Sequence, residues 1–236
     1  MSDLYDLGHA AQLHEIQRAR LRRGESGIGP MVEELIRRLT DGGVAGNTRD
    51  IRVAQAKRYW DLGVGRKLGF ASFEAYLTAI PEIPAALLQD DPEFPILLLV
   101  EPRLGLKKLC GLVNLAFDGD DKTFVVYRGA LPVLAWIRVQ DGRRNRYRSA
   151  CACRKSFGRH EIGLTALQGV CLYVQNPGLW SDLSDTDGHA LDLAGSVKCD
   201  ITFSAACLIV RSGRAWLDWH VDDDSNVKFG SASCRV

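Results

Sequence analysis

The feature that most constrains the fold is a change in apolar periodicity near residue 94. From there on, the chain consists of short β-branched and apolar runs separated by turn residues such as Asp118-Gly119-Asp120 and Asp141-Gly142. Such runs predict short strands, and they fall at 96–100, 112–117, 123–127, 133–139, 202–203, 207–210 and 215–220. Ser212-Gly213 predicts a tight hairpin between the last two runs.

The first ninety residues have helical patterns instead. Helices are predicted from Pro30 to Leu39, over 51–62, and over 73–80 with Ser72 as N-cap. One further helix, over 165–175, interrupts the strands. The Pro- and Asp-rich connector at 89–95 predicts a boundary between a helical N-terminal lobe (1–90) and a β-rich domain (91–236). The fold class is therefore α+β, mostly antiparallel, with one or two inserted helices.

The composition and charge of the chain exclude some classes of function. The formal net charge is +1, which excludes a wholly basic nucleic-acid binder but permits a local basic patch. The chain has no apolar run near the ~20 residues that cross a bilayer, and its first residues do not form a secretory signal. Seven cysteines, an odd number, argue against a disulfide framework. We therefore expect a cytoplasmic protein with reduced thiols, no membrane association and no cofactor.

Two segments carry a resemblance to a known family. Leu68-Gly69-Phe70-Ala71-Ser72-Phe73-Glu74-Ala75-Tyr76-Leu77, continued by Ile80-Pro81-Glu82-Ile83-Pro84, resembles a signature of an uncharacterised bacterial domain family. The tail Phe229-Gly230-Ser231-Ala232-Ser233-Cys234 is similar to the way those proteins end. The resemblance covers roughly residues 57–236. It implies one continuous domain and no particular chemistry.

The segment from Gly142 to His160 is the strongest functional hint, because it contains many cations and no acid. Guanidinium groups bind phosphates and an aromatic ring stacks on an unpaired base, so the mixture favours single-stranded RNA or DNA. On a strand, Arg144, Arg146 and Arg148 would share one face. The alternative is a solvated edge strand whose charges prevent aggregation. The candidate binding residues are Arg143, Arg144, Arg146, Tyr147, Arg148, Arg154, Lys155 and Arg159.

Cys151 and Cys153, with His160 nearby in sequence, suggest a thiol- or zinc-dependent enzyme. Their one-residue spacing does not match the paired cysteines of structural zinc sites, so no metal site is predicted. Cys234, near the end of the chain, is expected to be the most accessible thiol. An acidic loop with Asp182, Asp185, Asp187 and His189 leaves weak divalent-ion binding open.

Trp216, Asp218 and His220 alternate along one predicted strand and should share a face. They form a candidate exposed aromatic patch, in which Asp218 has the option of orienting the imidazole of His220. The catalytic residues, if any, remain unknown.

Three functions follow from these patterns. The leading hypothesis is a non-catalytic binding or interaction module, because no familiar catalytic constellation is present in the sequence. Nucleic-acid binding through residues 143–159 is the first alternative, and a thiol or zinc enzyme is the second. The expected partner is therefore either an unknown protein or a nucleic acid.

Overall fold

The computed structural model describes residues 44–128, 132–176, 190–225 and 228–235. The chain divides after Ala54, and Gln55–Val236 forms one compact unit that contains the sheets. The predicted boundary at 90/91 falls inside this unit. The first elements are α3 (Val44–Asp61), α4 (Val64–Lys67), α5 (Phe73–Thr78) and the 3-10 helix η1 (Ala85–Leu87). The predicted helix at Pro30 lies outside the described residues.

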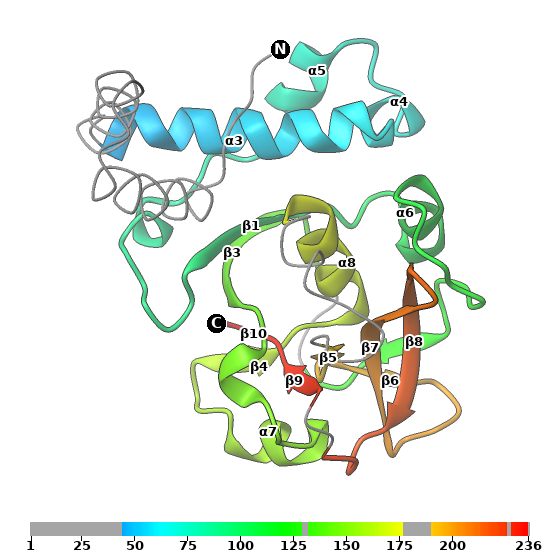
Figure 1. Cartoon of the computed structure of the whole chain (residues 1–236). Helices are drawn as coiled ribbons and strands as arrows, with labels where there is room; N and C mark the ends of the chain where they lie inside the picture. Colours follow the sequence, from blue (N-terminus) through cyan, green and yellow to red (C-terminus); the bar gives the residue numbers. More distant parts are fainter. Residues whose placement is uncertain (1–43, 129–131, 177–189, 226–227, 236) are drawn as a thin grey trace, which may run out of the picture. The chain divides into compact units, whose positions relative to one another are not determined.

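The strands form two four-stranded sheets and a two-stranded ribbon within the described residues (Figure 1). The first sheet has the order β1 (Ile96–Val100), β3 (Ala135–Gln140), β10 (Ser233–Arg235), β4 (Glu161–Gly163). The second has the order β8 (Arg214–Val221), β7 (Ser204–Arg211), β5 (Ala190–Leu193), β9 (Phe229–Ser231). The ribbon pairs β2 (Phe124–Val126) with β6 (Ser196–Lys198). These pairings are antiparallel except that of β5 with β9, so the α+β prediction is confirmed.

Helix α8 (Ala166–Gln175) contacts both larger sheets, through β1 and β7 (Figure 1). Thr165 begins it with a capping box, in which its hydroxyl accepts from the backbone N–H of Gln168. Gly169 allows close packing, because a Cβ there would lie 2.3 Å from a methyl carbon of Leu193. The helix predicted over 165–175 is therefore confirmed.

The C-terminal tail joins the two sheets. Strand β9 pairs with β5 in one sheet, and β10 pairs with β3 and β4 in the other. Ala232, between them, donates its N–H to Asp192 and accepts from Leu164. The side chains of Ser231, Ala232 and Ser233 are fully buried. Small residues are required here because the tail runs through the interior, which gives the Gly-Ser-Ala-Ser sequence a structural role.

The outer edge of β1 is covered by side chains of α3. Gln55 donates to the carbonyl of Leu97 (2.7 Å) and accepts from the N–H of Leu99 (2.8 Å). The buried hydroxyl of Tyr59 donates to the carbonyl of Leu99 (2.9 Å). These bonds satisfy backbone groups that an edge strand otherwise leaves open. They also tie the helices after residue 54 to the first sheet.

Three segments differ from the strands considered in the sequence analysis. Residues 202–203 form a turn before β7. The run 112–117 is not a strand: Leu112 ends α6 (Leu106–Leu112), and Ala116 makes a single bridge to Trp216. The segment after Gly142 is not a strand either, since it forms η2 (Arg143–Asn145) and α7 (Ala150–Ser156). Three α-helices, α6, α7 and α8, are thus inserted among the described strands, one more than the upper expectation. In the parts of the chain that the structure describes, no helix has the length and apolarity needed to span a bilayer.

Candidate functional site

The basic segment folds back onto the end of the tail instead of extending as a strand. Gly142 has a φ of 83°, and a Cβ there would lie 2.3 Å from the carbonyl oxygen of Gly230. The buried amide of Asn145 donates to the carbonyl of Ser231 (2.7 Å), and Arg146 bridges to Gly230. The predicted alternation of Arg144, Arg146 and Arg148 on one strand face is therefore wrong, because the backbone turns toward β9.

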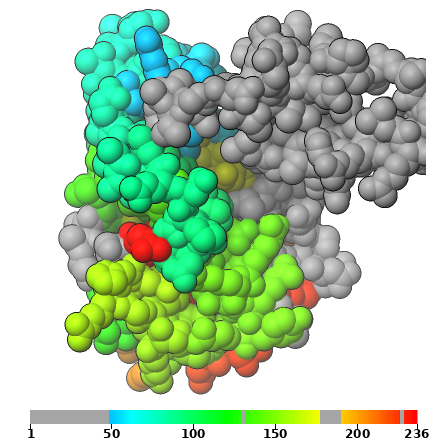
Figure 2. All heavy atoms as spheres, turned by 90° about the vertical axis from the view of Figure 1, so that its left-hand side faces the viewer, coloured from blue at the N-terminus to red at the C-terminus, as the bar shows by residue number. Residues whose placement is uncertain are grey.

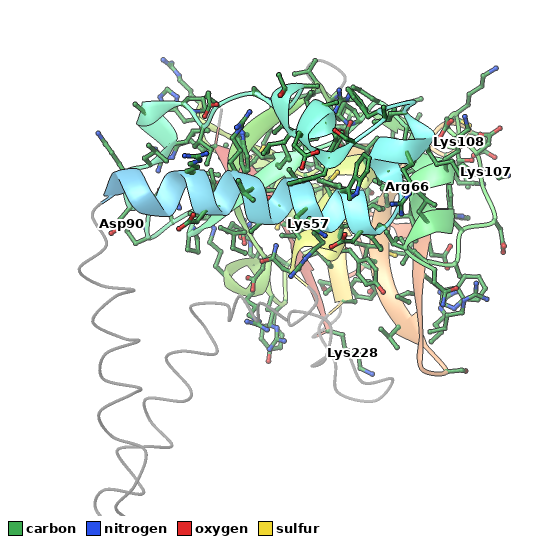
Figure 3. The ribbon with its side chains drawn as sticks, turned by 90° about the horizontal axis from the view of Figure 1, so that it is seen from above. Lys57, Arg66, Asp90, Lys107, Lys108 and Lys228 are labelled. Atoms are coloured by element: carbon green, nitrogen blue, oxygen red, sulfur yellow. The ribbon has the colours of Figure 1, made fainter. Side chains whose placement is uncertain are left out.

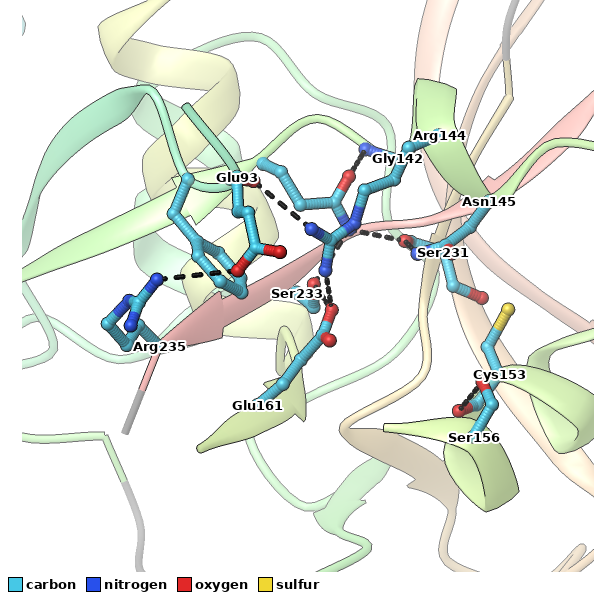
Figure 4. Close-up of polar contacts among 12 residues, drawn as sticks. Glu93, Gly142, Arg144, Asn145, Cys153, Ser156, Glu161, Ser231, Ser233 and Arg235 are labelled. Atoms are coloured by element: carbon cyan, nitrogen blue, oxygen red, sulfur yellow. Dashed lines mark hydrogen bonds and ion pairs between the residues drawn. The ribbon is translucent and has the colours of Figure 1, made fainter. Parts of the chain in front are cut away.

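Arg144 is bound within the protein (Figure 4). Its guanidinium pairs with Glu161 and donates to the carbonyl of Glu93 (3.3 Å). It also lies 4.8 Å from the ring centre of Phe94, whose ring Arg235 contacts at 5.1 Å. Arg144 therefore stabilises the C-terminal tail and is a poor candidate for ligand contact.

Arg154 is the most deeply held cation of the segment, with a side chain that is 6% exposed. It pairs with Asp222 (2.5 Å) and donates to the carbonyls of Ala194, Ser196 and Ser204 at 2.6–3.2 Å. Burial lowers the pKa of Arg154, and the charge of Asp222 opposes that shift. The group joins α7 to the second sheet, so the prediction of a binding role for Arg154 is not supported by its position.

The other candidates lie nearer the surface. Arg143 is exposed but pairs with Asp141 (3.3 Å). Tyr147 is 68% exposed and its φ is 65°. We call the following set the basic surface: Arg146, Tyr147, Arg148, Lys155 and Arg159. Of these, Arg148 is half-buried and the rest are exposed. The green-to-yellow part of the chain that holds the segment occupies the lower part of the face in Figure 2.

The cysteines of the segment are poorly placed for catalysis. Cys153 is fully buried, and burial raises the pKa of its thiol. The polar contact drawn beside it in Figure 4 is the hydrogen bond that the hydroxyl of Ser156 donates to the backbone carbonyl of Cys153 (3.0 Å). Cys151 is half-buried at the start of α7, whereas His160 is exposed beyond the end of that helix. Among the described residues, no group of three or more His, Cys, Asp or Glu side chains is arranged to hold a metal ion.

Thiol accessibility differs from the prediction. Cys234 is 2% exposed and lies in β10, where burial raises its pKa to about 12. Cys199 is the exposed cysteine of the described residues. The prediction for Cys234 is wrong because Ser233–Arg235 form β10, a strand between β3 and β4.

Trp216, Asp218 and His220 do share one face of β8, as their partners Ile209, Cys207 and Ala205 on β7 show. All three are half-buried, so the patch is less open than predicted. Asp218 pairs with Arg211 (2.6 Å) and accepts from the N–H of Trp219 (2.9 Å). Asp218 is thus engaged away from the imidazole that it was predicted to orient.

His220 pairs instead with Asp192, which is fully buried on β5 (2.7 Å between Nε2 and Oδ1). Ala205, on the strand between them, is small enough to let both side chains meet above it. Burial lowers the pKa of His220, but the hydrogen bond and charge of Asp192 outweigh it, so the pKa is raised overall. The ring also packs at 4.5 Å from Phe229.

The sequence analysis did not identify Asp192 as the partner of His220. The available signal was a carboxylate within the apolar run Ala-Leu-Asp-Leu, because a buried acid requires a counter-charge. Within the part of the chain that the structure describes, His220 Nδ1 and Ser231 Oγ are buried without a hydrogen-bond partner. An imidazole held by a carboxylate is able to accept or donate a proton, but the arrangement places no nucleophile in hydrogen-bond contact with it among the described residues.

The acidic loop with Asp182, Asp185, Asp187 and His189 lies outside the described residues. Comparison with known proteins gives no match: no family model fits the chain, and neither curated proteins nor solved structures resemble it significantly. The function must therefore be argued from the site alone.

Proposed function

We propose that this chain is a non-catalytic binding module whose ligand is single-stranded nucleic acid, bound on the basic surface. The observation that carries the proposal is Tyr147, an aromatic residue that is 68% exposed and lies between Arg146 and Arg148 in sequence. Cations that contact phosphates beside an aromatic ring that contacts a base are the combination found in sequence-tolerant single-strand binding.

The charge distribution supports this proposal. No acid occurs between Asp141 and Glu161, and those two flanking acids pair with Arg143 and Arg144. The acids nearest in sequence are therefore already matched by cations outside the basic surface. The basic surface thus contains four cations with no acid among them in sequence, although the whole chain has a formal net charge of +1.

The test is binding of a fluorescently labelled random single strand, measured by anisotropy at several salt concentrations. Each phosphate contact on a single strand contributes about 0.7 to the slope of log affinity against log salt. Replacing both Arg146 and Arg148 with Ala should therefore weaken binding and make the slope less steep by about 1.4.

The matched control removes two other cations. Lys107 and Lys108 lie on α6, away from the basic segment in sequence, and both are exposed (Figure 3). Their double replacement with Ala changes the net charge equally, so it separates site-specific contacts from total charge. The proposal fails if the wild type does not bind, or if the two double variants weaken binding equally.

A further inference from the structure

Tyr147 has a backbone conformation that suits other residue types better. Its φ of 65° lies in the left-handed region, which bulky L-residues rarely occupy. The other non-glycine residues with positive φ in the described chain are Asn114 and Ser212, which are small and polar. A tyrosine at such a position is unusual and costs conformational energy.

The turn itself is fixed from both sides. Before it, the amide of Asn145 is anchored to Ser231. After it, the hydroxyl of Ser149 accepts from the N–H of Ala152 and caps α7 (3.1 Å). The neighbouring contacts therefore impose the left-handed conformation at position 147, whichever side chain is present there.

The ring of Tyr147 does not compensate through packing. It is 68% exposed, and within the described residues its side chain has no hydrogen bond, ion pair or ring contact. The ring of Tyr127, in contrast, is in contact within the fold, because the guanidinium carbon of Arg154 lies 4.4 Å from its ring centre. The fold thus gains little from the aromatic ring at position 147.

We infer that Tyr147 is the base-stacking residue of the site and makes it selective for single strands over duplexes. This inference rests on the proposed function. A duplex presents its phosphates but keeps its bases stacked on one another, so only an unpaired base has a free face for the ring. Alanine substitution of such stacking residues typically weakens binding about tenfold or more.

The experiment compares single-stranded and duplex probes of equal length on Tyr147→Asn and Tyr147→Phe. Asparagine tolerates the left-handed region and lacks the ring. We expect Tyr147→Asn to lower single-strand affinity about tenfold, to change duplex affinity less than about twofold, and to keep the salt slope. Tyr147→Phe keeps the ring and should bind the single strand like the wild type.

A thermal unfolding curve adds a second readout. Because asparagine relieves backbone strain, the Tm of Tyr147→Asn should rise by about 2 °C. A fall in Tm would show that the ring stabilises the fold and would overturn the inference. So would unchanged single-strand affinity in Tyr147→Asn, or a loss in Tyr147→Phe as large as in Tyr147→Asn. If the wild type binds neither probe, the proposed function fails first; if the wild type binds the single strand and Tyr147→Asn binds it equally well, only the stacking inference fails.

Discussion

Replacement of Arg154 with Met is the most informative stability test, because it separates structural from surface cations within one segment. The Met side chain is similar in length but has no charge and no donors. The change leaves the carboxylate of Asp222, 10% exposed, without its ion-pair partner, and it removes the donor to three backbone carbonyls. Breaking one side of a buried pair typically costs about 3–5 kcal/mol.

Such a loss is large beside the roughly 5–15 kcal/mol by which domains are usually stable. Urea unfolding followed by tryptophan fluorescence measures it directly. Lys155→Met is the matched control, since Lys155 is the adjacent residue of α7 and is exposed; it should change the free energy of unfolding by less than about 0.5 kcal/mol.

The double variant Arg154→Met with Asp222→Asn tests the cause. If the lone carboxylate is responsible, removing its charge should restore about 1 kcal/mol or more of the loss, and the two single changes should not be additive. A cost below about 1 kcal/mol for Arg154→Met would place the pair with ordinary surface salt bridges and refute the reasoning.

Two further predictions concern titration and thiol chemistry. The pKa of His220 is raised in the folded protein, so its pair with Asp192 contributes its full stabilisation of the fold below the unfolded pKa of ~6.5. This contribution is lost as pH rises through the folded pKa. Urea unfolding measured across pH should show the loss in the wild type but not in His220→Gln, and parallel curves for the two proteins would contradict the prediction. In native protein treated with a thiol reagent, the exposed Cys199 should react first. The buried thiols should react only on unfolding, because burial raises their pKa; they are Cys110, Cys171, Cys207 and Cys234. Peptide mapping of the labelled sites checks this order.

Local signals predicted much of the fold. The hairpin at Ser212-Gly213 forms as expected, with φ values of 51° and 72° at its two turn residues. The cap predicted at Ser72 begins its helix, since its side chain accepts from the backbone N–H of Ala75. The helix predicted over 165–175 also forms, with Thr165 as its cap. These features depend on residues close in sequence, and for that reason a single sequence is enough to recognise them.

Long-range partners were not predictable in the same way. Asp192 and His220 are 28 residues apart and meet across an intervening strand. A strand over the basic segment would have placed Arg144, Arg146 and Arg148 on one face, but Gly142 and Asn145 direct the backbone against β9. Tertiary contacts with the buried tail decided the conformation there, and local propensity did not.

The arginines of the segment show why residue type alone is insufficient to define a binding site. Arg144 and Arg154 belong to the same acid-free run as Arg146 and Arg148, yet their partners lie 17 to 68 residues away and hold them in the structure. If the segment only kept the protein soluble, its exposed cations would be sufficient. A tyrosine in a strained backbone conformation among them would not be needed. The combination of exposed cations with a ring that the fold does not use is what favours a ligand-binding surface over a solvated one.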